Sequence, residues 1–428
     1  MSFPRYPKYK PSGVEWLGDV PEHWNVRRLA YFFLERREKV SDKDFEPLSV
    51  TMQGIVPRID TAAKTDDGDN RKKVCVGDFV INSRSDRKGS AGVSPLNGSV
   101  SLISTVLEPK PEVIGAYIHH LLRSVDFQEE YYRYGKGIVA DLWSTTYSEM
   151  RNISLAMPPK SEQTAIASFL DRETEKIDGL VGEQRRLIEL LKEKRQAVIS
   201  HAVTQGLNPH APRKPSGIEW LGDVPEHWTI PPLYVRYNQV LGKMLDQGKM
   251  TGEHPTPYLR NLDVRWDYVN VEDLPIMDIA PHERERFTVR KGDLLMVEGR
   301  ELGRCAIWQG DDGVIAFQKA LHRLRPLDSS EHVRFFYYLM IFVNGTGAFV
   351  ANQSPNEIPH LTGEELRKYR FPKPPHDEQL AIADYLDDMT AKLDAPTAEA
   401  ERGIELLQER RTALISAAVT GQIDVRGT

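Results

Sequence analysis

One fifteen-residue segment occurs twice in the chain and sets its plan. Residues 10–24 read KPSGVEWLGDVPEHW, and residues 214–228 repeat this segment with a single Val-to-Ile difference. A second pair of repeats follows, because residues 158–207 and 374–423 are identical at 26 of 50 aligned positions. Internal repeats of this length determine the architecture, so the chain consists of a motif, a variable block and a helical block, followed by the same three parts again.

The repeats divide the chain into four regions. We predict a first domain that includes the first motif, a central helical spacer, a second domain that includes the second motif, and a C-terminal helical spacer, at residues 1–157, 158–212, 213–373 and 374–428. The mixture of short strand-like runs with helical segments predicts an α+β fold, with a curved antiparallel sheet plus helices in each domain. The motif itself is interpreted as a packed lead-in whose tryptophans seal a domain edge, with direct partner binding as the alternative.

Short apolar runs bounded by Gly, Asp and Asn predict the strands of the variable blocks. In the first block these runs are PLSVTMQGIV, KVCVGDFVIN and GSVSLISTVLEP, and in the second YLRNLDVRW, KGDLLMVEGR and GVIAFQKALHRLRP. Helical periodicity predicts helices over residues 26–39, 113–132 and 332–343.

In the two spacer blocks, apolar residues recur at steps of three and four, which is typical of amphipathic coiled-coil helices. They are Ile166, Leu170, Ile177, Leu180, Leu187, Leu191 and Val198 in the first block and Ile382, Leu386, Leu393, Leu407 and Leu414 in the second. Pro396 is expected to break or restart the second helix, because proline lacks the backbone N–H. Two such helices in one chain are expected to pack antiparallel on each other, although two independent amphipathic helices would show the same pattern.

The net charge of −6 is confined to the last spacer block. Residues 374–428 carry 5 Lys or Arg against 11 Asp or Glu, whereas residues 25–157 carry 19 against 18 and residues 229–373 carry 19 against 19. Since affinity for DNA comes largely from neutralising phosphates, neutral blocks disfavour strong DNA binding by the chain alone. They are compatible with a module that reads bases while partner subunits hold the DNA backbone.

The sequence lacks the usual patterns of export, membrane insertion and catalysis. Two cysteines, one in each half, cannot build a disulfide framework or a zinc site, and no apolar run has transmembrane length, so a cytoplasmic protein is expected. Nucleotide-binding loops and metalloprotease motifs do not occur. Asp78 with Asp86, Arg87 and Lys88 has the D…DxK form of some nucleases, but a charged loop explains this short pattern better. We therefore predict no catalytic or metal-binding residues and a chain that is not an enzyme.

Basic and polar clusters in the variable blocks are the candidates for DNA contact. Arginine can donate two hydrogen bonds to guanine, and Gln or Asn can pair with adenine in the same way. Solvated loop charges are the alternative for any one of them. The candidates are Arg71, Lys72, Lys73, Asn82, Arg84, Ser85, Arg87 and Lys88 in the first block and Arg260, Asn261, Arg265, Arg300, Arg304, Gln318, Lys319, His322 and Arg323 in the second.

With its doubled order of motif, variable block and PP-x-x-EQ-x-x-IA helix, the chain resembles the specificity subunit of type I restriction–modification systems over essentially its whole length. The most specific matches are the SG[VI]EWLGDVPEHW segments and the residues Glu162, Gln163, Ile166, Ala167, Glu378, Gln379, Ile382 and Ala383. The resemblance implies two target recognition domains, each reading half of a split double-stranded DNA site, and spacer helices that dock two methyltransferase (modification) subunits. It also implies that partners bind the cofactors, S-adenosylmethionine and, where restriction subunits are present, ATP and Mg²⁺.

The leading hypothesis is thus a non-catalytic DNA sequence-recognition subunit with no membrane contact. A second hypothesis is an interaction scaffold that dimerises partners without reading DNA, and a third is a nuclease that uses Asp78 and Lys88. Exchanging residues 229–373 for those of a homologue distinguishes the first two, because only a reader would change half of its DNA target.

Overall fold

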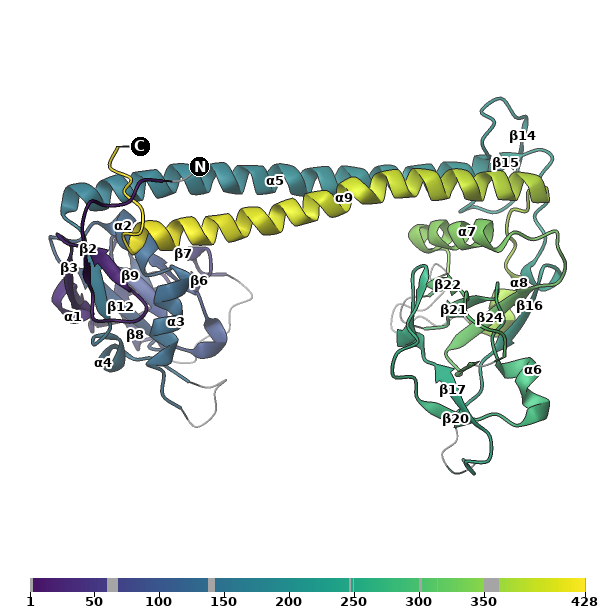
Figure 1. The fold of residues 1–428 in the computed structure, drawn as a ribbon, viewed down its shortest axis with the longest axis horizontal. Coiled ribbons are helices and arrows are strands. Elements are labelled where there is room, and N and C mark those ends of the chain that lie inside the picture. Colours follow the sequence, from purple (N-terminus) through teal and green to yellow (C-terminus); the bar gives the residue numbers. More distant parts are fainter. Residues whose placement is uncertain are drawn as a thin grey trace. The chain divides into compact units, whose positions relative to one another are not determined.

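The chain folds into two compact units, each of which contains one end of both long helices. The computed structural model describes residues 3–59, 68–137, 143–245, 248, 250–299, 302–313, 315–349 and 362–427. Unit 1 comprises residues 1–185 and 401–428, and unit 2 comprises residues 186–400. The two long helices are α5 (Lys160–Gln205) and α9 (His376–Val419) (Figure 1).

Unit 1 contains a four-stranded antiparallel sheet in the order β10-β9-β12-β4, with smaller sheets beside it. Before α5, its elements are β1 (Tyr9–Pro11), β2 (Asp19–Pro21), β3 (Asn25–Arg28), α1 (Leu29–Phe32), β4 (Phe33–Glu35), β5 (Lys39–Val40), β6 (Leu48–Thr51), β7 (Gly54–Pro57), β8 (Arg71–Val74), β9 (Phe79–Asn82), η1 (Ser85–Arg87), β10 (Ala91–Val93), β11 (Gly98–Val100), β12 (Ser104–Pro109), α2 (Gly115–Leu121), α3 (Val125–Arg133), α4 (Tyr147–Met150) and β13 (Ser154–Met157).

Unit 2 repeats this plan with the sheet order β22-β21-β24-β16, although a second sheet includes one parallel pair, β17 with β23. Its elements are β14 (Arg213–Pro215), β15 (Asp223–Pro225), η3 (Leu233–Val235), β16 (Tyr237–Leu241), β17 (Pro255–Leu259), η5 (Asn261–Asp263), β18 (Val264–Arg265), β19 (Tyr268–Val269), β20 (Ile276–Asp278), η6 (Pro281–Glu283), α6 (Arg284–Phe287), β21 (Leu294–Val297), β22 (Cys305–Ile307), β23 (Ala316–Phe317), β24 (Leu321–Pro326), α7 (Val333–Thr346) and α8 (Gly363–Lys368).

These strands and helices confirm the predicted α+β class and most of the predicted elements. The first predicted helix is wrong, because residues 26–39 form β3, the single turn α1 and β4. Leu29, Phe32 and Phe33 are all buried, but they contact the core from a strand–turn–strand path instead of one helix face. Residues 113–132 are helical but divide into α2 and α3, where Ser124 caps the second helix by accepting from the N–H of Phe127.

The repeated motif folds as a small hairpin that is attached to the start of a long helix. In unit 1, the Glu162 carboxylate accepts hydrogen bonds from the Tyr6 hydroxyl at 2.5 Å and from Trp24 Nε1 at 2.8 Å. Its second oxygen lies 2.8 Å from His23 Nε2. Trp24 is fully buried, so the interpretation of the motif as a packed segment agrees with the structure.

The glutamine of the EQ pair holds the polypeptide that precedes a domain helix. The side chain of Gln163 accepts from the backbone N–H of Ile114, which lies just before α2, and donates to the carbonyls of Glu112 and Pro158. Gln379 makes the equivalent bonds in unit 2, to the backbone of His332, Ser330 and Pro374. Each EQ pair thus joins the motif, the domain and the spacer helix of its own unit.

Within each unit the two long helices run antiparallel. Arg411 pairs with Asp178 at 3.0 Å in unit 1, and Arg195 pairs with Asp394 at 2.9 Å in unit 2. The offset between repeats is 216 residues, since 374 − 158 = 216, and the same offset separates both the two aspartates and the two arginines. The two ion pairs therefore join equivalent positions of the repeats.

The buried seam of α5 follows an eleven-residue spacing, which corrects the predicted heptad pattern. Leu180 and Leu187 are 46% and 42% exposed, whereas the isoleucines 166, 177, 188 and 199 are all buried. Eleven residues give about 3.67 residues per turn, against 3.5 for a heptad. A heptad repeat that starts at Ile166 consequently drifts off the seam after two heptads, and this drift placed the two leucines wrongly.

The predicted break at Pro396 is also wrong, because α9 continues through this residue. Pro396 lies on an exposed face of the helix, and so does Lys392, whose carbonyl loses its usual N–H partner. Water can bond that carbonyl, and buried Leu393 and Ala400 anchor the helix on either side. The packing of α9 therefore outweighs the local penalty.

Candidate nucleic-acid interface

The predicted DNA-contacting residues concentrate at one edge of each four-stranded sheet, around the loops that leave β9 and β21. In unit 1 the loop from β9 to β10 contains η1, and in unit 2 the equivalent loop joins β21 to β22. A hairpin lies beside each loop: β6–β7 against β10 in unit 1, and β18–β19 against β22 in unit 2. Two matching edges thus present different side chains.

The unit 1 edge exposes three cations on one short loop. Arg84, Arg87 and Lys88 are all exposed, and each is paired locally: Arg84 and Arg87 with Asp86, and Lys88 with Glu129. These pairs are at the surface, where ion pairs contribute little free energy and can exchange partners.

Two polar residues frame the same loop. The side chain of Asn82 accepts from the N–H of Arg84 at 3.1 Å, and the N–H of Ser85 donates to the carbonyl of Trp143 at 2.9 Å. The sequence prediction that placed Asn82, Arg84, Ser85, Arg87 and Lys88 together therefore agrees with their positions in the fold.

The three basic residues of β8, Arg71, Lys72 and Lys73, lie away from this loop and bond to other residues of unit 1. Arg71 is buried, and its guanidinium donates to the hydroxyl of Ser99 at 2.8 Å and to its carbonyl at 3.0 Å. Lys72 donates to the carbonyl of Ser104, and its pKa is lowered by burial. Lys73 pairs with Glu38 at 2.9 Å. We leave Arg71 and Lys72 out of the proposed contact set for this reason.

The unit 2 edge gathers four of the predicted residues. Arg260 is bidentate to Asp263, and Arg304 donates to the carbonyl of Asn261 at 2.9 Å. Arg265 is exposed on β18, and the described residues provide no ion-pair partner for it. Arg300, the remaining predicted cation of this loop, lies outside the described residues.

The pair His322 and Arg323 on β24 is buried and serves the core of unit 2. Arg323 donates from one nitrogen to the carbonyls of Glu285, Arg286 and Thr288, and burial lowers its pKa to about 10. His322 is fully buried beside Gln239. The sequence prediction grouped both with the basic and polar candidates for DNA contact, and because they are buried we do not retain them as contacts. Gln318 and Lys319 lie on the β23–β24 turn, where Lys319 is exposed.

The first aspartate of the D…DxK pattern is engaged in an ion pair within the fold. Asp78 is buried, and Arg36 holds both of its oxygens at 2.8 and 3.1 Å. Asp293, which follows a glycine in the same way in unit 2, is bound by Arg325 at 2.8 and 2.7 Å. Each arginine thus fixes the aspartate that directly precedes a strand, β9 in unit 1 and β21 in unit 2. No group of three or more His, Cys, Asp and Glu side chains among the described residues could hold a metal ion.

The predicted spacer residues lie mostly in the helix seams. Seven of the predicted apolar residues are buried: Ile166, Leu170, Ile177, Ile382, Leu386, Leu393 and Leu414. Three are half-buried, namely Leu191, Val198 and Leu407, and Leu187 is exposed. Glu162, Gln163 and Gln379 are also buried, and Glu378 lies 2.7 Å from His227. These four polar residues therefore bind within their own unit.

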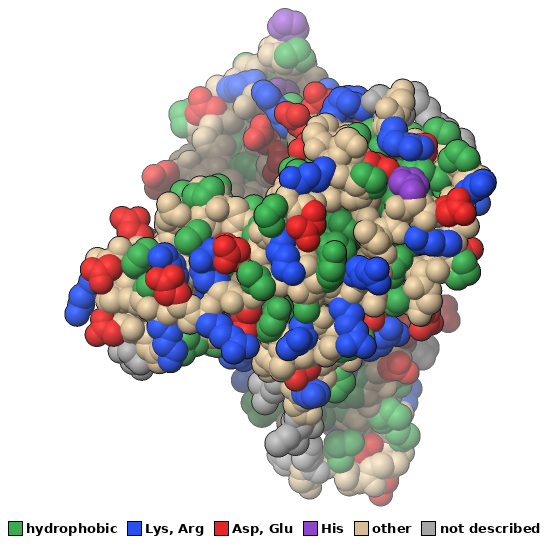
Figure 2. Space-filling model, turned by 90° about the vertical axis from the view of Figure 1, so that its left-hand side faces the viewer, with side chains coloured by type: hydrophobic (Ala, Val, Ile, Leu, Met, Phe, Trp, Pro, Cys, Tyr) green, Lys and Arg blue, Asp and Glu red, His purple; other side chains and the backbone are tan. Residues whose placement is uncertain are grey.

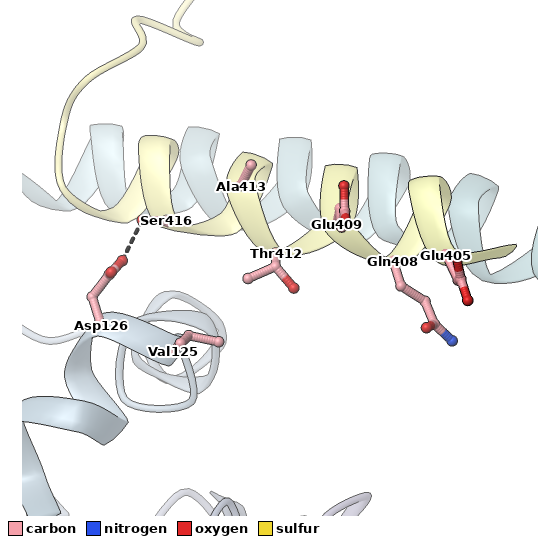
Figure 3. A pocket seen from close by; sticks show the side chains of 8 residues that line it. All are labelled: Val125, Asp126, Glu405, Gln408, Glu409, Thr412, Ala413 and Ser416. Carbon is pink, nitrogen blue, oxygen red and sulfur yellow. Dashed lines mark hydrogen bonds between the residues drawn. The ribbon is translucent and has the colours of Figure 1, made fainter. Parts of the chain in front are cut away.

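A cavity of about 610 Å³ in unit 1 has the wrong charge for DNA. It lies between the start of α3 and the last part of α9 and is lined by Val125, Asp126, Glu405, Gln408, Glu409, Thr412, Ala413 and Ser416 (Figure 3). The Asp126 carboxylate accepts from the Ser416 hydroxyl and so fastens α3 to α9. Carboxylates at this surface would repel phosphates.

On the face of the described residues that Figure 2 shows, Lys and Arg side chains do not form one continuous patch. Figure 2 shows Lys and Arg side chains interspersed with Asp, Glu and hydrophobic side chains over the face turned toward the viewer. This mixture agrees with the net charge of residues 25–157, which is close to zero because they carry 19 cationic and 18 anionic side chains. A near-neutral surface provides little sequence-independent attraction to phosphates.

Comparisons with known proteins find one family. The family model for the type I restriction modification DNA specificity domain matches residues 264–405. A putative type I restriction enzyme MjaX specificity subunit of Methanocaldococcus jannaschii is 21% identical over 449 residues, which cover 96% of each chain. The chain is therefore similar to type I restriction–modification specificity subunits over nearly its whole length.

Three further proteins show the same kind of similarity. The EcoKI specificity subunit of Escherichia coli is 21% identical over 368 residues, covering 82% of this chain and 76% of that one. A chain from a structure concerned with complex assembly and conformational transition of the type I R-M system has a TM-score of 0.73 at 16% identity, over 94% and 98% of the two chains. The HsdS subunit from Thermoanaerobacter tengcongensis has a TM-score of 0.55 at 18% identity, over the same shares.

At such identities the two solved structures support the fold of this chain and leave its contacts to be argued from its own residues. Of the described helices, none is both long and apolar enough to span a lipid bilayer.

Proposed function

We propose that the chain reads a bipartite DNA sequence, with unit 1 and unit 2 each reading one half. The observation that carries this proposal is the repeated edge: the same loop and hairpin occur in both units, with Arg84, Arg87 and Lys88 in one and Arg260, Arg265 and Arg304 in the other. Readers that share a scaffold but differ in these side chains would recognise two unlike half-sites. Each bidentate contact to a base supplies about 1–3 kcal/mol of discrimination.

The proposal includes the partners that a specificity subunit needs. Two methyltransferase subunits would dock on the exposed faces of the spacer helices, supply most phosphate contacts and bind S-adenosylmethionine, and restriction subunits, where present, would bind ATP and Mg²⁺. This chain would contribute no catalytic group. The near-neutral variable blocks support this division of labour, because a solitary binder would need an excess of cations. A cytoplasmic location follows from the same assignment.

Methylation mapping tests the proposal. Cells that carry this chain together with its modification subunit should show methylation at a target of two short sequences separated by unread base pairs, and cells without the chain should not. Replacing residues 229–373 with those of another specificity subunit should change one half of the target and leave the other intact. A continuous target, or unchanged methylation after the exchange, would refute the bipartite reading.

A further inference from the structure

The hairpin β18–β19 is held in place by one arginine that comes from a different element. Arg334, at the start of α7, donates from Nη1 to Asp267 at the hairpin turn. Its Nε and Nη2 atoms lie 2.8 and 2.7 Å from Asp387 on α9. A single guanidinium therefore joins the hairpin, α7 and α9, and Figure 1 shows α7 beside β22, the strand that the hairpin contacts.

The guanidinium of Arg334 is fixed by its surroundings. It lies 4.6 Å from the ring centroid of Tyr337 and 5.0 Å from that of Tyr338. The Tyr338 hydroxyl donates to the same Asp387 oxygen at 2.6 Å. Only a planar group with donors on several sides can meet two carboxylates while it stacks on aromatic rings, so lysine could not replace it fully.

The hairpin turn needs such support. Asp267 has φ = 56°, one of two non-glycine residues with positive φ among those described. A side chain in this left-handed region is sterically unfavourable, although aspartate tolerates the region better than most residues. The N–H of Asp267 donates to the carbonyl of Cys305 at 3.3 Å, and Trp266 contacts the ring of Tyr337 edge-on. Contacts on both sides of the turn thus fix the hairpin.

The side chains that the β18–β19 hairpin exposes to solvent are of the kinds that bind nucleic acids. Arg265 is exposed and has no ion-pair partner within the described part of the chain, and Tyr268 beside it is 54% exposed. An arginine with an adjacent tyrosine offers a bidentate donor and a flat ring. The basic loop residue Arg304 bonds to Asn261, just before the hairpin, so both features belong to one surface.

Unit 1 has an equivalent hairpin with a different anchor. Arg123 donates to the carbonyl of Met52 at the β6–β7 turn, at 2.5 Å, and its other nitrogen lies 2.5 Å from His119 Nε2. A Cβ built on Gly92 of β10 would lie 3.0 Å from the Gly54 Cα, so the hairpin and strand are in close contact. Each unit therefore uses an arginine to hold a hairpin beside its basic loop.

We propose that Arg334 is a positioning residue for DNA recognition, holding the β18–β19 hairpin so that Arg265 contacts bases in the half-site read by unit 2. This inference rests on the proposed function and deepens it, since it names the surface of unit 2 that meets DNA. Arg334 itself does not touch the DNA.

The test measures base discrimination by the assembled complex of this chain with its modification subunit. Methyl transfer is compared on duplexes that carry the target or single-base changes at each read position, with unit 2's half-site assigned by exchanging residues 229–373. Arg265→Gln should reduce discrimination about tenfold at one or two positions of that half-site. Arg334→Gln should reduce it at the same positions, and Arg334→Lys should have an intermediate effect.

Arg286→Gln is the matched control, because Arg286 is an exposed arginine of the same unit on α6. It should keep full discrimination at every position. Unchanged discrimination in Arg334→Gln would overturn the inference, and so would a uniform loss over both half-sites or a fall in melting temperature without a change in base preference. If the wild-type complex reads no bipartite target, the proposed function fails first and the inference fails with it.

Discussion

At the scale of single residues, the most consequential side chain is a buried carboxylate that gathers three donors. Glu162 bonds to Tyr6, Trp24 and His23, whereas its equivalent Glu378 bonds to His227 and is more exposed. Glu162→Ala would leave the Tyr6 hydroxyl and the Trp24 N–H buried without their acceptor. We expect it to lower the free energy of unfolding of unit 1 by about 3 kcal/mol, from the cost of unpaired buried donors.

Glu378→Ala is the comparison variant and should cost clearly less, because only one partner is lost at a wetter position. Urea unfolding monitored by tryptophan fluorescence measures both changes. Equal losses in the two variants would show that the additional bonds of Glu162 contribute no net stability.

A second residue-scale prediction concerns pH. Burial, reinforced by the nearby Arg123 guanidinium, lowers the pKa of His119 to about 4, below its value of about 6.5 in an unfolded chain. Between these two values the unfolded chain binds a proton that the folded chain does not, so the free energy of unfolding should fall as the pH drops from about 6.5 to about 4.

His119→Gln removes this titration, and its stability should therefore decline less steeply over the same interval. Denaturant midpoints measured from pH 4 to pH 8 give both curves. Carboxylates that titrate near pH 4 affect wild type and variant alike, so only the difference between the curves is informative. Parallel curves would contradict the assignment.

At the scale of elements, α9 contains an unfavourable interior proline, and the packing of the helix compensates for it. A proline in the interior of a helix is about 3 kcal/mol less favourable than alanine. Pro396 is exposed, and nothing in the seam depends on its ring. Pro396→Ala should therefore raise the free energy of unfolding, by up to about 3 kcal/mol.

The repeat provides the opposite control at the equivalent position of α5. Leu180 is 46% exposed, so Leu180→Pro should destabilise mainly through the helix backbone and not through lost core packing. Thermal unfolding followed by circular dichroism at 222 nm measures both variants. A lower melting temperature for Pro396→Ala would mean that the proline ring makes a contact that stabilises the fold.

These elements also show how far the sequence could be interpreted. The repeats predicted the duplicated plan, and apolar runs between turn residues predicted most strands, because both patterns are local. The path of residues 26–39 depends on a strand pairing, β3 with β13, that joins positions more than 120 residues apart. No local periodicity carries that information. The seam of α5 was visible in the isoleucine spacing of 11, but the leucines at heptad positions obscured it.

For the candidate site, the sequence identified loops more reliably than individual contacts. Arg84, Arg87 and Lys88 are exposed as expected for a loop. Arg71 and Arg323 have the same chemistry but bond to buried oxygens contributed by distant strands and loops. Arg334 was missed because it lies inside an apolar helical run, where its two aspartate partners are far away in the sequence.

At the scale of the whole molecule, unit 1 depends on both ends of the chain. Tyr9 donates to the carbonyl of Gly421, and the side chain of Gln422 donates to the carbonyl of Asp19. Arg426 lies 4.9 Å from the ring of Tyr6, and the N–H of Asp424 donates to the carbonyl of Pro4 at 2.8 Å. The last residues thus complete the packing of the first motif.

Unit 2 contains neither end of the chain, so truncation should separate the stabilities of the two units. Deleting residues 420–428 removes these contacts and exposes buried Trp24, against which Gly421 packs. We expect faster hydrogen exchange throughout the motif and sheet of unit 1 and unchanged exchange in the sheet of unit 2, since local unfolding follows cooperative units. Deleting only residues 427 and 428, which make none of these contacts, is the control. Equally faster exchange in both sheets would mean that the chain unfolds as a single cooperative unit, and exchange by mass spectrometry distinguishes the two outcomes.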